Sequence, residues 1–133
     1  SVIGIACLAA QYFGVPVVFA KKTKTINIYS DTYNATVHSY THKKDYDIVV
    51  SKDFLNKDDN VLIIDDFLAK GSALTALLML IEKAGAKTAG AGIVIEKAYQ
   101  GGGNLVRDMG VRVESLAKIK SISEKDGIVF CKQ

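Results

Sequence analysis

Apolar residues along the chain fall into two patterns, continuous runs and helical spacing. The stretches 61–66 (VLIIDD) and 88–97 (TAGAGIVIEK) are apolar runs that end in charged residues, as is typical of strands buried on both faces of a parallel sheet. Between them, 72–86 (SALTALLMLIEKAGA) has the spacing of an amphipathic helix, with Ser72 as the expected N-cap and Gly85 as the expected C-cap residue. Strand, helix and strand in succession predict an α/β fold with a parallel sheet flanked by helices.

The rest of the chain continues this alternation and adds one antiparallel feature. Alternating polar and apolar residues at 24–30 and 34–41 flank turn residues at 31–34, which predicts a two-stranded excursion from the main sheet. The glycines at 101–104 (GGGN) predict a flexible turn. The remaining expected elements are helices at 1–13 and 104–110 and strands at 15–22, 46–51, 111–123 and 128–132.

Composition and charge are those of a globular protein. The 133 residues are 49% hydrophobic and 23% charged, which suits one domain over residues 1–133 and excludes a disordered tail. The net charge of +3 permits an anionic ligand, and without a dense lysine and arginine block we expect no nucleic-acid partner. Cys7 and Cys131 lie far apart in apolar runs, which favours buried thiols in a reducing cytoplasm over metal ligation. No stretch has the character of a membrane span or a signal peptide, so we expect no membrane partner.

The stretch that joins the strand at 61–66 to the helix at 72–86 carries the most informative chemistry. In open α/β sheets, ligands bind at the carboxyl ends of the strands, which is where Asp65 and Asp66 are expected. The loop after them is built of small residues and leads into a helix, whose backbone N–H groups and dipole suit a phosphate. Two adjacent carboxylates bind sugar hydroxyls or help to hold a divalent cation, so the pattern indicates a phosphorylated sugar. The alternative is that Asp65 caps the turn and Asp66 is merely exposed.

The whole run 61–74 (VLIIDDFLAKGSAL) resembles the 5-phosphoribosyl 1-diphosphate (PRPP) signature of type I phosphoribosyltransferases. Together with 14–22 (GVPVVFAKK), 89–100 (AGAGIVIEKAYQ) and 111–119 (VRVESLAKI), it is similar to the bacterial xanthine-specific branch of that family. The resemblance implies the type I phosphoribosyltransferase fold, with a small antiparallel hood at about 22–46. It also implies transfer of 5-phosphoribosyl from PRPP to xanthine, giving xanthosine 5′-monophosphate and diphosphate in purine salvage. The implied cofactor is Mg²⁺, held mainly by PRPP, with no protein side chain expected as a ligand.

Matched position by position, the resemblance assigns roles to single residues. Asp65 and Asp66 become the catalytic acidic pair at the ribose hydroxyls. Lys97 donates to an oxo group of the purine, and Tyr99 stacks on its ring. The remaining positions bind phosphate groups: Ala69, Lys70, Gly71, Ser72 and Ala73 cradle the 5′-phosphate of PRPP, whereas Ser1, Val2, Lys21, Lys22 and Lys24 belong to the pyrophosphate loop and the hood.

Some positions depart from the family pattern. Ala69 stands where hypoxanthine–guanine relatives place an Asp near the purine, which argues against that branch. Lys70 and Ala73 stand where many relatives have Thr, so the phosphate would rely more on backbone N–H groups, on Ser72 and on Lys70 itself. Lys21 replaces an Arg that is common in relatives, which removes a bidentate phosphate contact.

The resemblance also concerns the start of the chain and its partners. Family members carry further residues before Ser1, including a strand that lies between those at 15–22 and 61–66, so we expect such a segment and regard the domain as incomplete at its N-terminus. A cytoplasmic homodimer is implied. The alternatives are a PRPP-binding purine-operon transcriptional regulator on the same fold, or a phosphoribosyltransferase for another purine base. The mild charge and the Lys97–Tyr99 base site favour the enzyme.

Overall fold

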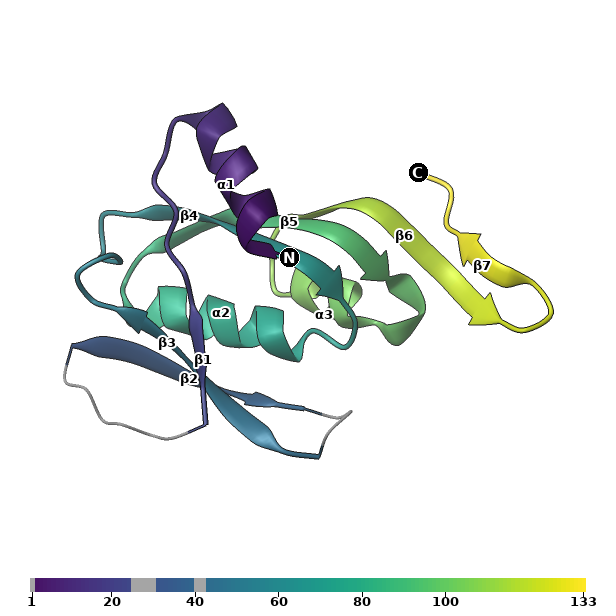
Figure 1. Cartoon of the computed structure of the whole chain (residues 1–133), viewed down its shortest axis with the longest axis horizontal. Coiled ribbons are helices and arrows are strands. Elements are labelled where there is room, and N and C mark those ends of the chain that lie inside the picture. Colours follow the sequence, from purple (N-terminus) through teal and green to yellow (C-terminus); the bar gives the residue numbers. More distant parts are fainter. Residues whose placement is uncertain (1, 25–30, 40–42) are drawn as a thin grey trace.

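A computed structural model describes residues 2–24, 31–39 and 43–133 of the chain (Figure 1). The helices are α1 (Val2–Phe13), α2 (Ser72–Lys83) and α3 (Gly102–Asp108), with a short 3₁₀ helix η1 (Ala98–Gln100). The strands are β1 (Lys21–Thr23), β2 (Thr32–His38), β3 (Asp45–Ser51), β4 (Asn60–Leu68), β5 (Lys87–Lys97), β6 (Val113–Ser123) and β7 (Gly127–Phe130).

The main sheet has the strand order β4-β5-β6-β7. Strands β4, β5 and β6 run parallel, as the apolar runs and the intervening helix predict. Strand β7 adds to β6 in the antiparallel direction, so the sheet is mixed at that edge rather than wholly parallel. Figure 1 shows α2 and α3 beneath this sheet, and α2 contacts both β4 and β5. The expected α/β architecture is confirmed.

The core of the main sheet lies between β4, β5 and β6 and the two helices α2 and α3. Leu74 of α2 and Val106 of α3 are 1% and 0% exposed, which shows how tightly both helices pack on the sheet. Burial of such side chains stabilises the fold by about 1.5–3 kcal/mol each. The buried residues of this cluster are Ile63, Leu68, Leu74, Leu78, Ile81, Ala91, Ile93, Val106 and Val113.

A smaller antiparallel sheet, with the order β1-β3-β2, packs against the other side of α2. Its existence is confirmed, but its pairing differs from the expected hairpin. Strand β2 pairs with β3, from Thr32 opposite Ser51 to His38 opposite Asp45. The expected turn at 31–34 is wrong because residues 32–34 already pair with β3 and belong to the strand. The expected strand at 24–30 lies almost wholly outside the described residues. Of the expected strand at 15–22, only Lys21 and Lys22 lie in a ladder, where β1 pairs with β3.

The ends of α2 and the start of α3 also differ from expectation. Gly71, with a φ of 90°, is the N-cap of α2, so Ser72 is the first helical residue rather than the cap. Gly85, with a φ of 72°, follows the C-cap Ala84 in the left-handed conformation that suits glycine. Gly102 and Gly103 form the buried first turn of α3, so the expected flexible turn at 101–104 is wrong there. A side chain at either position would collide with neighbouring residues, which explains why small residues occur in this helix.

Candidate functional site

The acidic pair lies inside the last residues of β4 rather than after its end. Both side chains are half-buried. The Asp66 N–H donates to Asp65 Oδ1 at 2.9 Å, and the Phe67 N–H donates to Asp66 Oδ1 at 2.8 Å. Burial is the main reason that the pKa of Asp65 is raised to about 6; the Asp66 amide opposes the shift, and the Asp66 carboxyl adds to it. The alternative of a merely exposed Asp66 does not hold, and the pair offers carboxylate oxygens to a ligand that brings donors or a cation.

The loop from Ala69 to Ala73 turns directly from β4 into α2. Gly71 takes the left-handed conformation at the N-cap, and the first residue of the helix is Ser72. The loop is also fixed from outside, because the Gly102 N–H donates to the Ala69 carbonyl at 3.0 Å. The first turn of a helix presents backbone N–H groups without intrahelical partners, and no acidic residue of α2 opposes an anion there. The geometry of this loop suits a phosphate group.

The residues expected to bind the base lie at the end of β5 and just after it, next to the acidic strand. In the parallel ladder, Leu68 pairs with Glu96, so Lys97 lies at the same edge of the sheet as the end of β4. The Lys97 ammonium lies 5.8 Å from the centroid of the Phe67 ring. Tyr99, in η1, is 48% exposed and leaves its ring accessible. The structure therefore brings the acidic pair, the loop and Lys97 to one edge, as the sequence predicted from strand ends alone.

The small sheet connects to the acidic pair through a residue that sequence reasoning missed. The Lys22 ammonium lies 4.1 Å from the centroid of the Tyr46 ring, a cation–π contact between β1 and β3. Burial raises the pKa of Tyr46, and so does the charge of the nearby Asp65. Only the alternation of 46–51 was visible in the sequence, and that pattern places Tyr46 in a strand without showing what it faces.

The other expected pyrophosphate and hood residues are less closely tied to the acidic pair. Lys21 pairs with Val49 in the β1–β3 ladder, and Lys24 follows β1; both are exposed. Val2 begins α1, a helix that contacts β4. Ser1 lies outside the described residues.

A groove of about 550 Å³ opens between β2 and α2 and reaches the loop. Lys70, Gly71 and Ser72 line one end of it, and Lys83 belongs to its α2 wall. The acidic pair and Lys97 are not among its lining residues. This groove is therefore not the space in which a ligand could touch the acidic pair, the loop and Lys97 together.

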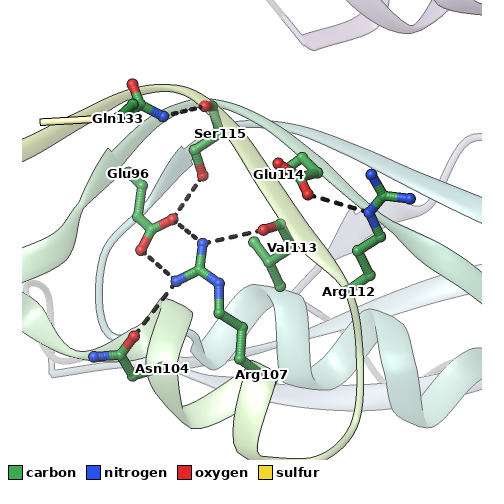
Figure 2. A network of polar contacts seen from close by, with 8 residues as sticks. All are labelled: Glu96, Asn104, Arg107, Arg112, Val113, Glu114, Ser115 and Gln133. Carbon is green, nitrogen blue, oxygen red and sulfur yellow. Dashed lines mark hydrogen bonds and ion pairs between the residues drawn. The ribbon is translucent and has the colours of Figure 1, made fainter.

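A buried carboxylate beside Lys97 is the second feature that the sequence did not reveal. Glu96 is only 2% exposed, and Arg107 of α3 pairs with both of its oxygens (Figure 2). Ser115 of β6 donates a further hydrogen bond to Glu96 Oε1 at 2.6 Å. The Arg107 guanidinium is the main cause that lowers the pKa of Glu96, so the carboxylate is ionised at neutral pH. In the sequence, Glu96 and Lys97 are both charged residues at a predicted strand end. Only the structure shows that Glu96 is buried whereas Lys97 is accessible.

Neither a built metal cluster nor a membrane helix is found in the part of the chain that the structure describes. Within these residues, no group of three or more His, Cys, Asp or Glu side chains could hold a metal ion. None of the described helices is long and apolar enough to cross a membrane.

The fold and this arrangement define the class of the protein. The family model of the phosphoribosyl transferase domain matches residues 3–123. The chain belongs to this family, and its fold is the type I phosphoribosyltransferase fold.

Individual relatives show which members of the family the chain resembles. The chain is 55% identical over 127 residues to a xanthine phosphoribosyltransferase of Lachnoclostridium phytofermentans, an alignment that covers 96% of this chain and 66% of that protein. It is 55% identical over 123 residues to xanthine phosphoribosyltransferase 1 of Clostridium perfringens, covering 92% of this chain and 65% of the relative. Among solved structures, the APRTase of Giardia lamblia complexed with 9-deazaadenine has a TM-score of 0.72 and 28% identity, over 84% of this chain and 61% of that one. The chain thus spans just under two-thirds of the length of these curated relatives.

Proposed function

We propose that the full-length protein transfers the 5-phosphoribosyl group of PRPP to xanthine, giving xanthosine 5′-monophosphate and diphosphate in purine salvage. The observation that carries this proposal is the placement of the acidic pair, the loop 69–73 and Lys97 at one edge of the sheet. Relatives at 55% identity that are named xanthine phosphoribosyltransferases support the choice of base.

The acidic pair and the loop bind the ribose 5-phosphate part of PRPP. The loop 69–73 holds the 5′-phosphate through backbone N–H groups and the Ser72 hydroxyl. Asp65 and Asp66 then accept hydrogen bonds from the ribose hydroxyls. The bond from C1′ to the diphosphate breaks with its electron pair on the leaving oxygen, a purine nitrogen forms the new bond to C1′, and the proton of that nitrogen is released to water. Two carboxylates near C1′ stabilise the positive charge that develops there.

Lys97 and Tyr99 select and orient the base. An ammonium group has donors only, so Lys97 pairs with an oxo group and has nothing to offer the exocyclic amine of adenine. Tyr99 is exposed enough for its ring to stack on the purine. Ala69 carries no carboxylate near the base, which is compatible with xanthine because xanthine ionises readily.

Mg²⁺ enters with PRPP and is held mainly by the diphosphate. The residues present fit this arrangement, because Asp65 and Asp66 offer their carboxylate oxygens to the ribose hydroxyls and leave the diphosphate oxygens, which Mg²⁺ prefers as ligands, to hold the ion. When bound, the ion neutralises charge that develops on the leaving diphosphate.

The remaining parts of the proposal concern the surroundings of this site. Residues 1–133 belong to one domain, with a hood at about 22–46 in which Lys21, Lys22 and Lys24 face the diphosphate. Ser1 and Val2 end the pyrophosphate loop. The protein acts in the cytoplasm as a homodimer, without a nucleic-acid or membrane partner.

The test is nucleotide formation by the full-length protein with PRPP, Mg²⁺ and each of xanthine, guanine, hypoxanthine and adenine in separate reactions. We expect xanthine to be the best substrate. The Asp66→Ala variant in the same assay should lower kcat by about 10²-fold, because it removes a charge that acts in the transition state. The exposed Asp58→Ala is the control and should keep the wild-type rate. An active protein that prefers another base would contradict the choice of xanthine, and no product with any base would favour a PRPP-binding regulator.

A further inference from the structure

We propose that Glu96 and Arg107, together with Gly102 and Gly103, are positioning residues that fix the base segment 97–101 relative to the phosphate loop 69–73. The functional consequence rests on the proposed phosphoribosyl transfer, whereas the mechanical coupling can be tested without it. None of these four residues is expected to touch a substrate.

Glu96 is held from two elements at once (Figure 2). Its Oε1 accepts from Arg107 Nη2 at 2.7 Å, and its Oε2 accepts from Arg107 Nη1 at 2.9 Å, a forked pair with fixed geometry. The Ser115 hydroxyl of β6 completes the shell of Oε1, and Arg107 Nη2 also donates to the Val113 carbonyl at 3.1 Å. The end of β5, helix α3 and the start of β6 are thereby locked in one arrangement.

Stability is a weak reason for such a pair to exist. Replacing a buried ion pair by apolar side chains of similar volume is often neutral or stabilising, because each charge is costly to remove from water. A forked pair instead fixes the relative orientation of the two side chains, because both of its hydrogen bonds form only in that orientation. The position of the pair matters for this reason: Glu96 directly precedes Lys97, the residue that contacts the base in the proposed function.

Gly102 and Gly103 connect the fixed Glu96–Arg107 pair to the phosphate loop. A Cβ on Gly103 would lie 2.7 Å from Glu96 Cδ, so the first turn of α3 rests directly on the buried carboxylate. A Cβ on Gly102 would lie 2.5 Å from Gly71 N, and the Gly102 N–H donates to the Ala69 carbonyl at 3.0 Å. The first turn of α3 is therefore wedged between Glu96 and the phosphate loop.

The base segment 97–101 is fixed at both of its ends by this arrangement. Glu96 holds the residue before it, and Gly102, bonded to the loop, holds the residue after it. In the proposed reaction the loop sets the position of C1′ through the 5′-phosphate, and the segment sets the position of the purine nitrogen. A displacement of about 1 Å between two reacting groups can cost about 10²-fold in rate. The first turn of α3, which lies between Glu96 and the phosphate loop, therefore sets the distance between C1′ and the purine nitrogen.

The test compares two double variants of the full-length protein. Glu96→Met with Arg107→Met removes the buried pair. Glu114→Met with Arg112→Met makes the same chemical change at a pair at the start of β6, where Glu114 of the strand and Arg112 just before it are 71% and 77% exposed. Both are assayed for the KM of xanthine, the KM of PRPP and kcat, and both for amide hydrogen exchange at Gly102.

We expect the buried double variant to raise the KM for xanthine by about tenfold and to lower kcat, with the KM for PRPP within about twofold of wild type. The Gly102 amide should exchange at least about tenfold faster, because the first turn of α3 is no longer held in place beside the loop. The exposed double variant should leave all four quantities unchanged. A purely structural role would lower the amount of active protein without separating the two KM values.

Unchanged KM for xanthine, or unchanged Gly102 exchange, in a folded buried variant would overturn the inference. Should that variant fail to fold, Arg107→Lys replaces it, because lysine keeps the charge and loses the forked pairing, and the same criteria apply. Should the wild type form no nucleotide with any base, the proposed function fails, and the exchange at Gly102 alone decides the inference.

Discussion

Asp65 is a residue whose burial costs the folded protein stability, a cost that its proposed role in ligand binding would explain. Its carboxyl is half-buried beside Asp66, and its charge helps to raise the pKa of Tyr46 of β3. Burial raises its pKa from 3.8 to about 6, so at neutral pH the folded protein holds a charge that water would stabilise better. A ribose hydroxyl or a cation supplied by the ligand would offset this cost. In the proposed function, binding of the ligand would therefore stabilise this carboxylate.

This raised pKa predicts a pH-dependent effect of Asp65→Asn on stability. Between pH 4 and pH 6 the carboxyl ionises in the unfolded chain while the folded protein keeps its proton, so wild-type stability falls as pH rises through this window. Asparagine does not titrate. The variant should therefore match the wild type near pH 4 and have a higher Tm above pH 6, as measured by thermal melts from pH 4 to pH 8.

The control for this prediction is Asp58→Asn, an exposed carboxyl in the turn before β4. Its effect on Tm should not follow the same course between pH 4 and pH 6. A difference in Tm between Asp65→Asn and the wild type that stays constant across the range would show that burial does not perturb the Asp65 carboxyl.

At the scale of elements, the contact between α3 and the phosphate loop depends on the absence of a side chain at Gly102. A Cβ on Gly102 would collide with the Ala69 carbonyl oxygen and would lie 2.5 Å from Gly71 N, which is closer than real Cβ atoms come to other atoms. This approach of α3 to the loop therefore requires glycine at position 102. The loop that suits a phosphate is therefore shaped by the helix behind it as well as by its own residues.

Gly102→Ala should destabilise the protein by about 2 kcal/mol, because the new methyl group must push α3 away from the loop. Gly4→Ala is the matched control, since Gly4 is also helical and no atom lies within 4 Å of its added Cβ. That change should be neutral or should stabilise by up to about 1 kcal/mol. Chemical denaturation of both variants measures the difference, and equal effects would contradict the tight packing of α3 on the loop.

The same contact shows what the sequence could and could not predict. Strand ends and the apolar runs were enough to place Asp65, Asp66 and Lys97 at one edge, because parallel strands share their carboxyl edge. The glycines at 101–104 read as a turn, since local propensity disfavours glycine in a helix. Tertiary packing overrides that preference, and a packing contact between distant segments leaves no local pattern. The burial of Glu96 was hidden for the same reason, because its partner Arg107 comes from another element.

At the scale of the whole molecule, α2 is shared by two cores. Leu74 and Leu78 pack toward the main sheet, while Ala76 and Leu80 pack toward the small sheet. The helix begins at Ser72, in the phosphate loop, so both sheets pack against the helix that follows this loop (Figure 1). The small sheet in turn presents Lys22 over Tyr46, near Asp65. The parts proposed to bind phosphate, ribose and diphosphate are thus joined through one helix.

The central claim is that this edge of the sheet joins a phosphoribosyl group to an oxo purine. The most direct measurement gives the full-length protein PRPP, Mg²⁺ and equal amounts of xanthine and adenine in one reaction and determines the ratio of the two nucleotides formed. We predict that xanthosine 5′-monophosphate predominates in the wild type and that Lys97→Ala lowers the ratio by at least about tenfold, because it removes the donor to the oxo group. A product that is mainly adenosine 5′-monophosphate, or a ratio that Lys97→Ala leaves unchanged, would contradict the account.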